Sequence, residues 1–311
     1  MTTIPIVFCI DDHFILAAGV CISSLLTHTG EKTFYDIYIL HDDKSQFPHS
    51  GFLEKLENRF DNFRLIYKCV EKEFEGAFEI RGITRTAYYR LLIPELIPEH
   101  DRIMYHDVDV IFRSDLAQIF STVKLDDAYV AGVVSPGTLD PKVRTQRVKM
   151  GLVPEEYILS GDLIFNSKKI REDDLIACFR KEALNKYPYQ DMDILNLVCK
   201  GKIKRLPPMF CGTTEIFNIA SNNIPQNLYT GNELQDLLTK GIIHYNGQKP
   251  WIGGCPNMDI WWEYYRNSVF FDQQYYYDFF NSMLSELDRL SLWKRIKLIF
   301  RYFLVANDKS A

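Results

Sequence analysis

Long apolar runs are missing from this chain of 311 residues, and none approaches the roughly 18–20 residues that a membrane-spanning helix needs. The first residues lack the basic segment of a signal peptide and lead straight into a strand-like stretch at residues 4–10. We therefore expect a cytoplasmic protein. No GxGxxG or GxxxxGK[ST] motif occurs, which argues against an NAD-type or P-loop nucleotide site.

Paired cysteines and an excess of positive charge are also missing. The seven cysteines include no CxxC pair, which argues for reduced thiols and against a zinc site or a disulfide framework. The net charge of −5 argues against nucleic acid as a partner. Hydrophobic residues make up 47% and charged residues 25%, as in ordinary globular proteins with a sizeable core.

Short apolar segments alternate with helical ones in the first half of the chain. Residues 4–10, 36–40 and 64–70 read as strands, and residues 17–26 and 51–60 read as helices between them. This order predicts βαβ units and a mostly parallel sheet. We expect one α/β domain over residues 1–258 and a helical C-terminal region over residues 259–311.

Asp107 and Asp109 form the sharpest motif, an Asp-Val-Asp between apolar residues. In an extended segment, residues two apart face the same side, so the two carboxylates lie together and repel each other. A divalent cation removes that cost, and paired oxygen ligands suit Mg²⁺ or Mn²⁺. The alternative is a solvated turn after a strand.

Further candidates also follow apolar segments. His244 precedes Gly247 and Lys249, which suggests a metal ligand beside a phosphate site, although a capping histidine and an Asn-Gly turn would look the same. Asp11 follows the first strand, where an acid can bind a base or a ribose. Arg90 either binds a phosphate or an acidic group or is an ordinary surface residue. The role of Asp191 is left open. Asp193 is predicted to be the N-cap of a helix over residues 194–199.

The order of these motifs resembles glycosyltransferase family 8, the retaining nucleotide-sugar transferases. The similarity runs from about residue 4 to residue 262, through AYYR, DVD, QDMD and HYNGQKPW. It implies a single Rossmann-like nucleotide-sugar-binding domain of the GT-A type with a mixed central sheet. It also implies a UDP-galactose or UDP-glucose donor, a saccharide or lipid-linked saccharide acceptor, and Mn²⁺, with Mg²⁺ as the alternative. Such enzymes act in lipopolysaccharide or cell-surface polysaccharide synthesis.

The resemblance also assigns roles to individual residues. Metal binding falls to Asp107, Asp109 and His244, and the sugar side of the reaction falls to Asp191 and Arg90. Nucleotide and phosphate contacts fall to the following residues: Asp11, His13, Asp107, Val108, Asp109, Gly247 and Lys249.

Several positions depart from the family pattern. Leu159 stands where the family often has asparagine, Met192 replaces a glutamine, and Ser135 stands where an acid is often found. The late motif is one residue short before Lys249. We therefore expect a functional binding site for the metal ion and UDP, and an altered pocket for the sugar or the acceptor. The alternatives are an inactive nucleotide-sugar-binding protein and another metal-dependent nucleotide enzyme.

The C-terminal region is aromatic and then basic. Residues 260–280 read as a packed helical lid, since aromatic side chains dominate core burial. Residues 292–304 place Trp293, Phe300 and Phe303 at helical spacing, with Lys294, Lys297 and Arg301 on another face. This pattern is typical of a helix that lies on an anionic membrane, here the cytoplasmic face of the inner membrane. The alternative is a helix docked on the acidic body.

Overall fold

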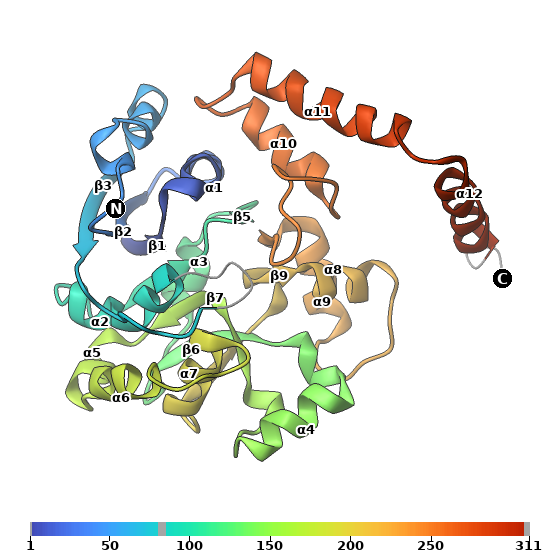
Figure 1. The fold of residues 1–311 in the computed structure, drawn as a ribbon. Helices are drawn as coiled ribbons and strands as arrows, with labels where there is room; N and C mark the ends of the chain where they lie inside the picture. Colours follow the sequence, from blue (N-terminus) through green and yellow to red (C-terminus); the bar gives the residue numbers. More distant parts are fainter. Residues whose placement is uncertain (1, 80–84, 308–311) are drawn as a thin grey trace.

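The computed structural model describes residues 2–79 and 85–307 of the chain. A seven-stranded sheet forms its centre, with strand order β3-β2-β1-β4-β7-β6-β8 (Figure 1). The strands are β1 (Thr2–Cys9), β2 (Thr33–Asp42), β3 (Phe63–Val70), β4 (Ile103–His106), β6 (Val130–Val134), β7 (Ile158–Phe165) and β8 (Ile203–Leu206). All neighbours are parallel except at β7, which runs antiparallel to β4 and β6, so the predicted α/β fold with a mixed sheet is confirmed.

Alternation along the strands divides the core between the two faces of the sheet. Ile4, Ile6 and Phe8 of β1 join one apolar cluster, whereas Val7 joins the other, as the period of two residues in a strand requires. The first cluster includes residues of α1 (Ile15–Thr27), α8 (Thr214–Ser221), α9 (Gly231–Lys240) and α10 (Met258–Arg266). The second includes residues of α5 (Ser167–Glu172), α6 (Leu175–Glu182) and α7 (Gln190–Val198).

A second, three-stranded sheet sits beside the end of β4. Its strands are β5 (Val110–Ile111), β10 (Ile243–His244) and β9 (Gly212–Thr213). His244 pairs with Val110 in this sheet, so a residue from late in the chain lies against the Asp-Val-Asp segment between β4 and β5. The small sheet thereby fixes the distance between two of the predicted motifs.

Short helices complete the fold: α2 (Ile93–Leu96), α3 (Ala117–Thr122) and α4 (Pro141–Lys149). A 3₁₀ helix over Arg85–Leu92 precedes α2, and Pro94 lies in the first turn of α2, where its missing N–H costs no helical hydrogen bond. The chain breaks between α5 and α6, because Asp174 adopts a left-handed conformation with φ of 53°.

The C-terminal region begins inside the core and ends away from it. Trp261, Trp262 and Tyr265 of α10 are buried in the first cluster, as expected of a packed aromatic segment. Next come α11 (Gln273–Asp288) and α12 (Leu292–Asn307), and Figure 1 shows α12 standing apart from the sheet and its helices. No described helix is long and apolar enough to cross a membrane. The side chains of Arg301 and Phe303 lie outside the described residues.

Candidate functional site

A cavity of about 720 Å³ lies at the carboxyl ends of β1, β4 and β6. Open α/β sheets bind their ligands at this edge. Nine of the ten side chains that the sequence proposed for the site line it: Asp11, Arg90, Asp107, Val108, Asp109, Asp191, His244, Gly247 and Lys249. His13 is exposed and is not among the lining residues; its backbone N–H donates to the carboxylate of Asp11 at 3.0 Å, and the next residue, Phe14, lines the cavity.

Three ligand atoms converge at the centre of this cavity. Nε2 of His244 lies 3.3 Å from Oδ1 of Asp109 and 3.7 Å from Oδ2 of Asp107. The other carboxylate oxygens are engaged, since Asp107 Oδ1 accepts from Tyr105 and pairs with Arg90 at 2.9 Å, and Asp109 Oδ2 pairs with Lys249. One nitrogen and two oxygens therefore face one another, a donor set that fits a divalent cation such as Mn²⁺.

The backbone next to this group leaves no space for a side chain. A Cβ on Gly161 would lie 2.3 Å from Cε1 of His244 and 2.7 Å from Oδ2 of Asp107. The carbonyl of Gly161 also accepts from the N–H of Asp107 at 2.7 Å. The glycine thus lets β7 approach both predicted metal ligands.

Opposing charges set the protonation of the three predicted ligands. Burial raises the pKa of Asp107, against the effect of Arg90. Burial acts in the same direction on Asp109, but His244 and Lys249 outweigh it and lower the pKa of that carboxyl. Burial disfavours a charged His244, yet Asp109 and Asp162 raise its pKa well above the ordinary 6.5. Without a cation, His244 therefore holds a proton at neutral pH.

We expect divalent cations to bind more tightly as the pH rises from 6 to 8. A histidine ligates as the neutral imidazole, so a cation must displace the proton that the raised pKa keeps on His244, and affinity is lost as the pH falls. Calorimetric titration with Mn²⁺ in two buffers of different ionisation enthalpy measures both affinity and released protons. An affinity independent of pH, with no proton released, would contradict this.

Arg90 connects the predicted metal ligands to Asp191. Its guanidinium lies 2.9 Å from Asp107 Oδ1 and 3.3 Å from Asp191 Oδ2, and it donates to the carbonyl of Ser160 at 2.7 Å. Asp191 lies in the first turn of α7, and burial raises its pKa, opposed by Arg90. Both side chains are buried, so Arg90 is a clamp between two carboxylates and not a surface residue.

The N-cap expected at Asp193 is wrong, because α7 begins at Gln190 and Tyr189 precedes it. The carboxylate of Asp193 instead accepts from the hydroxyl of Tyr157 at 2.6 Å and from the backbone N–H of Tyr189 at 2.8 Å. Asp193 therefore holds the segment before α7 and does not begin the helix.

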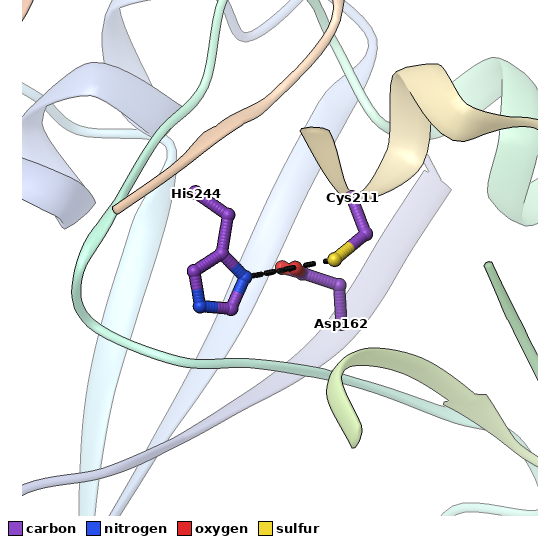
Figure 2. A group of neighbouring side chains, drawn as sticks. All are labelled: Asp162, Cys211 and His244. Carbon is purple, nitrogen blue, oxygen red and sulfur yellow. Dashed lines mark hydrogen bonds and ion pairs between the residues drawn. The ribbon is translucent and has the colours of Figure 1, made fainter. Parts of the chain in front are cut away.

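Sequence reasoning missed a buried group behind His244. Asp162 of β7 accepts from Nδ1 of His244 at 2.7 Å through one oxygen and from Nδ1 of His106 at 2.6 Å through the other. Figure 2 shows Asp162 and Cys211 on the Nδ1 side of the His244 ring. Asp162 is a charged residue inside an apolar strand pattern, and that was the available signal.

This buried group also contains three atoms that could ligate a metal, one each from Asp162, Cys211 and His244. The 2.7 Å between Nδ1 and the carboxylate oxygen is a hydrogen-bond distance. Burial raises the pKa of the Cys211 thiol well above its usual value, which keeps it protonated. We therefore interpret the group as support for His244.

Comparison with known proteins places these observations in a family. The model of glycosyl transferase family 8 matches residues 5–253. Glycosyltransferase GlyB of Streptococcus pneumoniae is 26% identical over 85% of this chain and 62% of its own length. The lipopolysaccharide 1,2-glucosyltransferase of Escherichia coli is 25% identical over 78% of this chain and 71% of its own.

Solved structures show the same architecture. The galactosyltransferase LgtC, in complex with donor and acceptor sugar analogues, superposes with a TM-score of 0.72 at 23% identity, over 88% of this chain and 99% of that one. The bifunctional glycosyltransferase WbbM gives 0.70 at 21% identity, over 91% of this chain and 52% of that one. The chain thus spans less than two thirds of GlyB and about half of WbbM.

Proposed function

The chain belongs to glycosyltransferase family 8 and has a GT-A fold, and we propose that it transfers galactose or glucose from a UDP-sugar to a saccharide acceptor with retention of configuration. The convergence of Asp107, Asp109 and His244 in the cavity carries this proposal. Similar proteins include lipopolysaccharide glucosyl- and galactosyltransferases, which favours a role in lipopolysaccharide or cell-surface polysaccharide synthesis.

We propose that the donor diphosphate binds next to the three converging ligand atoms, through the cation that they would hold. A bound Mn²⁺, or Mg²⁺ as the alternative, would supply the positive charge that stabilises the departing UDP. Lys249 lies at the edge of this site, where its ammonium contacts Asp109 and donates to the carbonyl of Tyr245 at 2.6 Å. We propose that Lys249 and Gly247 contact the phosphates, with Val108 beside them, and that Asp11 binds uracil at the end of β1. The nucleotide contact assigned to His13 remains a prediction.

Arg90 and Asp191 line the same cavity as the three converging ligand atoms, and we propose that the transferred sugar binds beside them. Arg90 is already paired with both Asp107 and Asp191, so it holds the two carboxylates in a fixed relation. We propose that the pair orients the hexose while the acceptor hydroxyl attacks from the face that UDP leaves. The bond from the anomeric carbon to UDP breaks, the bond to the acceptor oxygen forms, and the acceptor proton passes to a phosphate oxygen.

UDP release from a panel of UDP-sugars, with and without Mn²⁺, tests this function. We expect release from UDP-galactose or UDP-glucose that depends on the cation, slow in water and faster with a saccharide acceptor. Tight UDP binding without release from any donor would favour the nucleotide-sugar-binding alternative. Absence of UDP binding would refute the proposal.

We also propose that α12 attaches the protein to an anionic membrane on the cytoplasmic side, and that residues 259–311 form a separate functional region. Trp293 and Phe300 are 75% and 65% exposed, and Figure 1 shows α12 away from the body, which favours a membrane over the alternative of a helix docked on the body. Lys294 and Lys297 lie on the same helix and are also exposed. Each basic residue near anionic lipid contributes about 1 kcal/mol.

The chain is expected to float with vesicles that contain anionic lipid and to stay behind with neutral vesicles. Trp293→Glu combined with Phe300→Glu should abolish flotation, because it places charge on the inserted face. Phe271→Glu changes an exposed aromatic residue outside α12 and serves as the matched control. Equal flotation of the double variant and the control would contradict the proposal.

A further inference from the structure

One basic side chain of the cavity wall has no acid beside it. Arg147 of α4 is 3% exposed, and its guanidinium donates to the hydroxyl of Ser135 at 2.9 Å and to the hydroxyl of Thr138. It also stacks 3.7 Å from the ring centre of Tyr157. Within residues 2–79 and 85–307, no ion pair joins Arg147 to a carboxylate, and its Nε lacks a hydrogen-bond partner.

A buried cation without an anion is costly, because neutral hydroxyls replace only part of its hydration. Burial lowers the pKa of Arg147, and the surrounding tyrosines and Asp193 oppose that shift. Asp193 does not contact the guanidinium, since its two oxygens accept from Tyr157 and Tyr189. Arg90, in the same cavity, contrasts with this because it pairs with two acids. The positive charge of Arg147 thus has no counterion among the described residues, and we expect a ligand to supply one.

The strand order places Arg147 at the end of the cavity away from the nucleotide. Asp11 follows β1 and Asp107 follows β4, whereas Ser135, the partner of Arg147, follows β6. With β7 between β4 and β6, Ser135 lies about two strand spacings, roughly 10 Å, across the sheet from Asp107. A group that meets Arg147 therefore lies beyond the proposed diphosphate site, on the side of the cavity where the hexose and the acceptor would meet.

The chemistry of the Arg147 side chain suits an oxyanion. The helix that carries it, α4, also holds Lys142, Arg144 and Lys149; Arg144 pairs with Glu155, and Asp140 caps the start of the helix. A guanidinium offers several N–H donors in one plane, the geometry that matches a phosphate or a carboxylate. The hydroxyl of Ser135 can turn to donate to the same anion, whereas the hydroxyl of Thr138 already donates to the carbonyl of Pro154 at 2.8 Å and serves to hold Arg147 in place.

We propose that Arg147, with Ser135 beside it, binds an anionic group, a phosphate or a carboxylate, carried by the saccharide acceptor. This inference rests on the proposed function and specifies its acceptor. An anionic sugar on the donor is the other source of the same chemistry, and the experiment separates the two.

Binding is measured by calorimetry with the full chain held in its Mn²⁺–UDP complex. The probes are galactose, galactose 6-phosphate and galacturonic acid. A charge-assisted contact with a buried guanidinium predicts that at least one of the two anionic sugars binds about tenfold more tightly than galactose. Galactose and galacturonic acid differ only at one carbon, which carries a hydroxyl in the first and a carboxylate in the second. The difference between their affinities therefore reports the effect of the negative charge.

Two variants remove the charge preference in different ways. Arg147→Met keeps the length of the side chain without its charge, and Ser135→Asp supplies a carboxylate that pairs with Arg147 inside the fold. Both are expected to bind galactose and the anionic sugars equally. Lys149→Gln removes one positive charge from the exposed side of the same helix and should keep the preference.

Absence of binding by both anionic sugars, or equal binding of all three probes by the unchanged chain, overturns the inference. A preference that survives in Arg147→Met and in Ser135→Asp also overturns it. A preference found for UDP-galacturonic acid over UDP-galactose, but not among the free sugars, places the anion on the donor and refutes the acceptor assignment. UDP affinity is recorded in the same samples, and its absence would refute the proposed function itself.

Discussion

Replacing Asp109 with asparagine is expected to lower metal-dependent UDP release by about a thousandfold, because a metal ligand at a departing diphosphate supplies several kcal/mol. Oδ1 of Asp109 faces Nε2 of His244 at 3.3 Å, and Oδ2 contacts Lys249. The amide keeps the size of the side chain but removes its charge and one oxygen. Release from UDP-galactose and UDP-glucose, measured against Mn²⁺ concentration, should show lost affinity for the cation together with the lost rate.

Asp127→Asn makes the same chemical change at an exposed position in the loop before β6 and should leave both quantities unchanged. Loss of rate without loss of Mn²⁺ affinity would mean that Asp109 acts on the substrate directly. An unchanged rate would remove the Asp-Val-Asp segment from the proposed mechanism.

The local sequence was sufficient to predict which side chains follow strands and line the cavity. Asp11 and Asp107 come directly after apolar runs, and parallel strands bring such positions to one edge of the sheet. Local sequence also marked His244 as a possible metal ligand, but only the family resemblance joined it to Asp107 and Asp109, since His244 reaches Asp109 through the pairing of β5 with β10. The pairing of two such short strands, far apart in the chain, leaves no pattern that sequence alone reveals.

The support behind His244 could not be predicted, because it depends on register. His106 meets Asp162 where β4 pairs antiparallel with β7, and the two residues are 56 positions apart. A slip of one residue would turn either side chain to the other face of the sheet. The sequence left Arg90 as either a clamp or a surface residue, because the choice depends on the positions of Asp107 and Asp191 at once.

Asp162 holds His244 in the orientation that the proposed metal site requires. Its carboxylate accepts from Nδ1 of both His244 and His106, so Nε2 of His244 is directed at Asp107 and Asp109. Burial raises the pKa of Asp162, but the two histidines outweigh it and lower that pKa to about 2, so the group is ionised at neutral pH. The two rings donate to different oxygens of Asp162, and only a carboxylate side chain offers two acceptor oxygens.

Asp162→Asn is therefore expected to weaken Mn²⁺ binding by about ten- to a hundredfold, because its NH₂ must face one of the two rings and disturbs the tautomer of His244. Calorimetry gives the affinity, and the ¹⁵N shifts of the imidazole report which nitrogen carries the proton. Asp36→Asn alters another buried carboxylate, one that bonds Arg64 on the far side of β1, and should lower stability without changing Mn²⁺ affinity. Equal affinities in Asp162→Asn and the unchanged chain would show that His244 needs no such support.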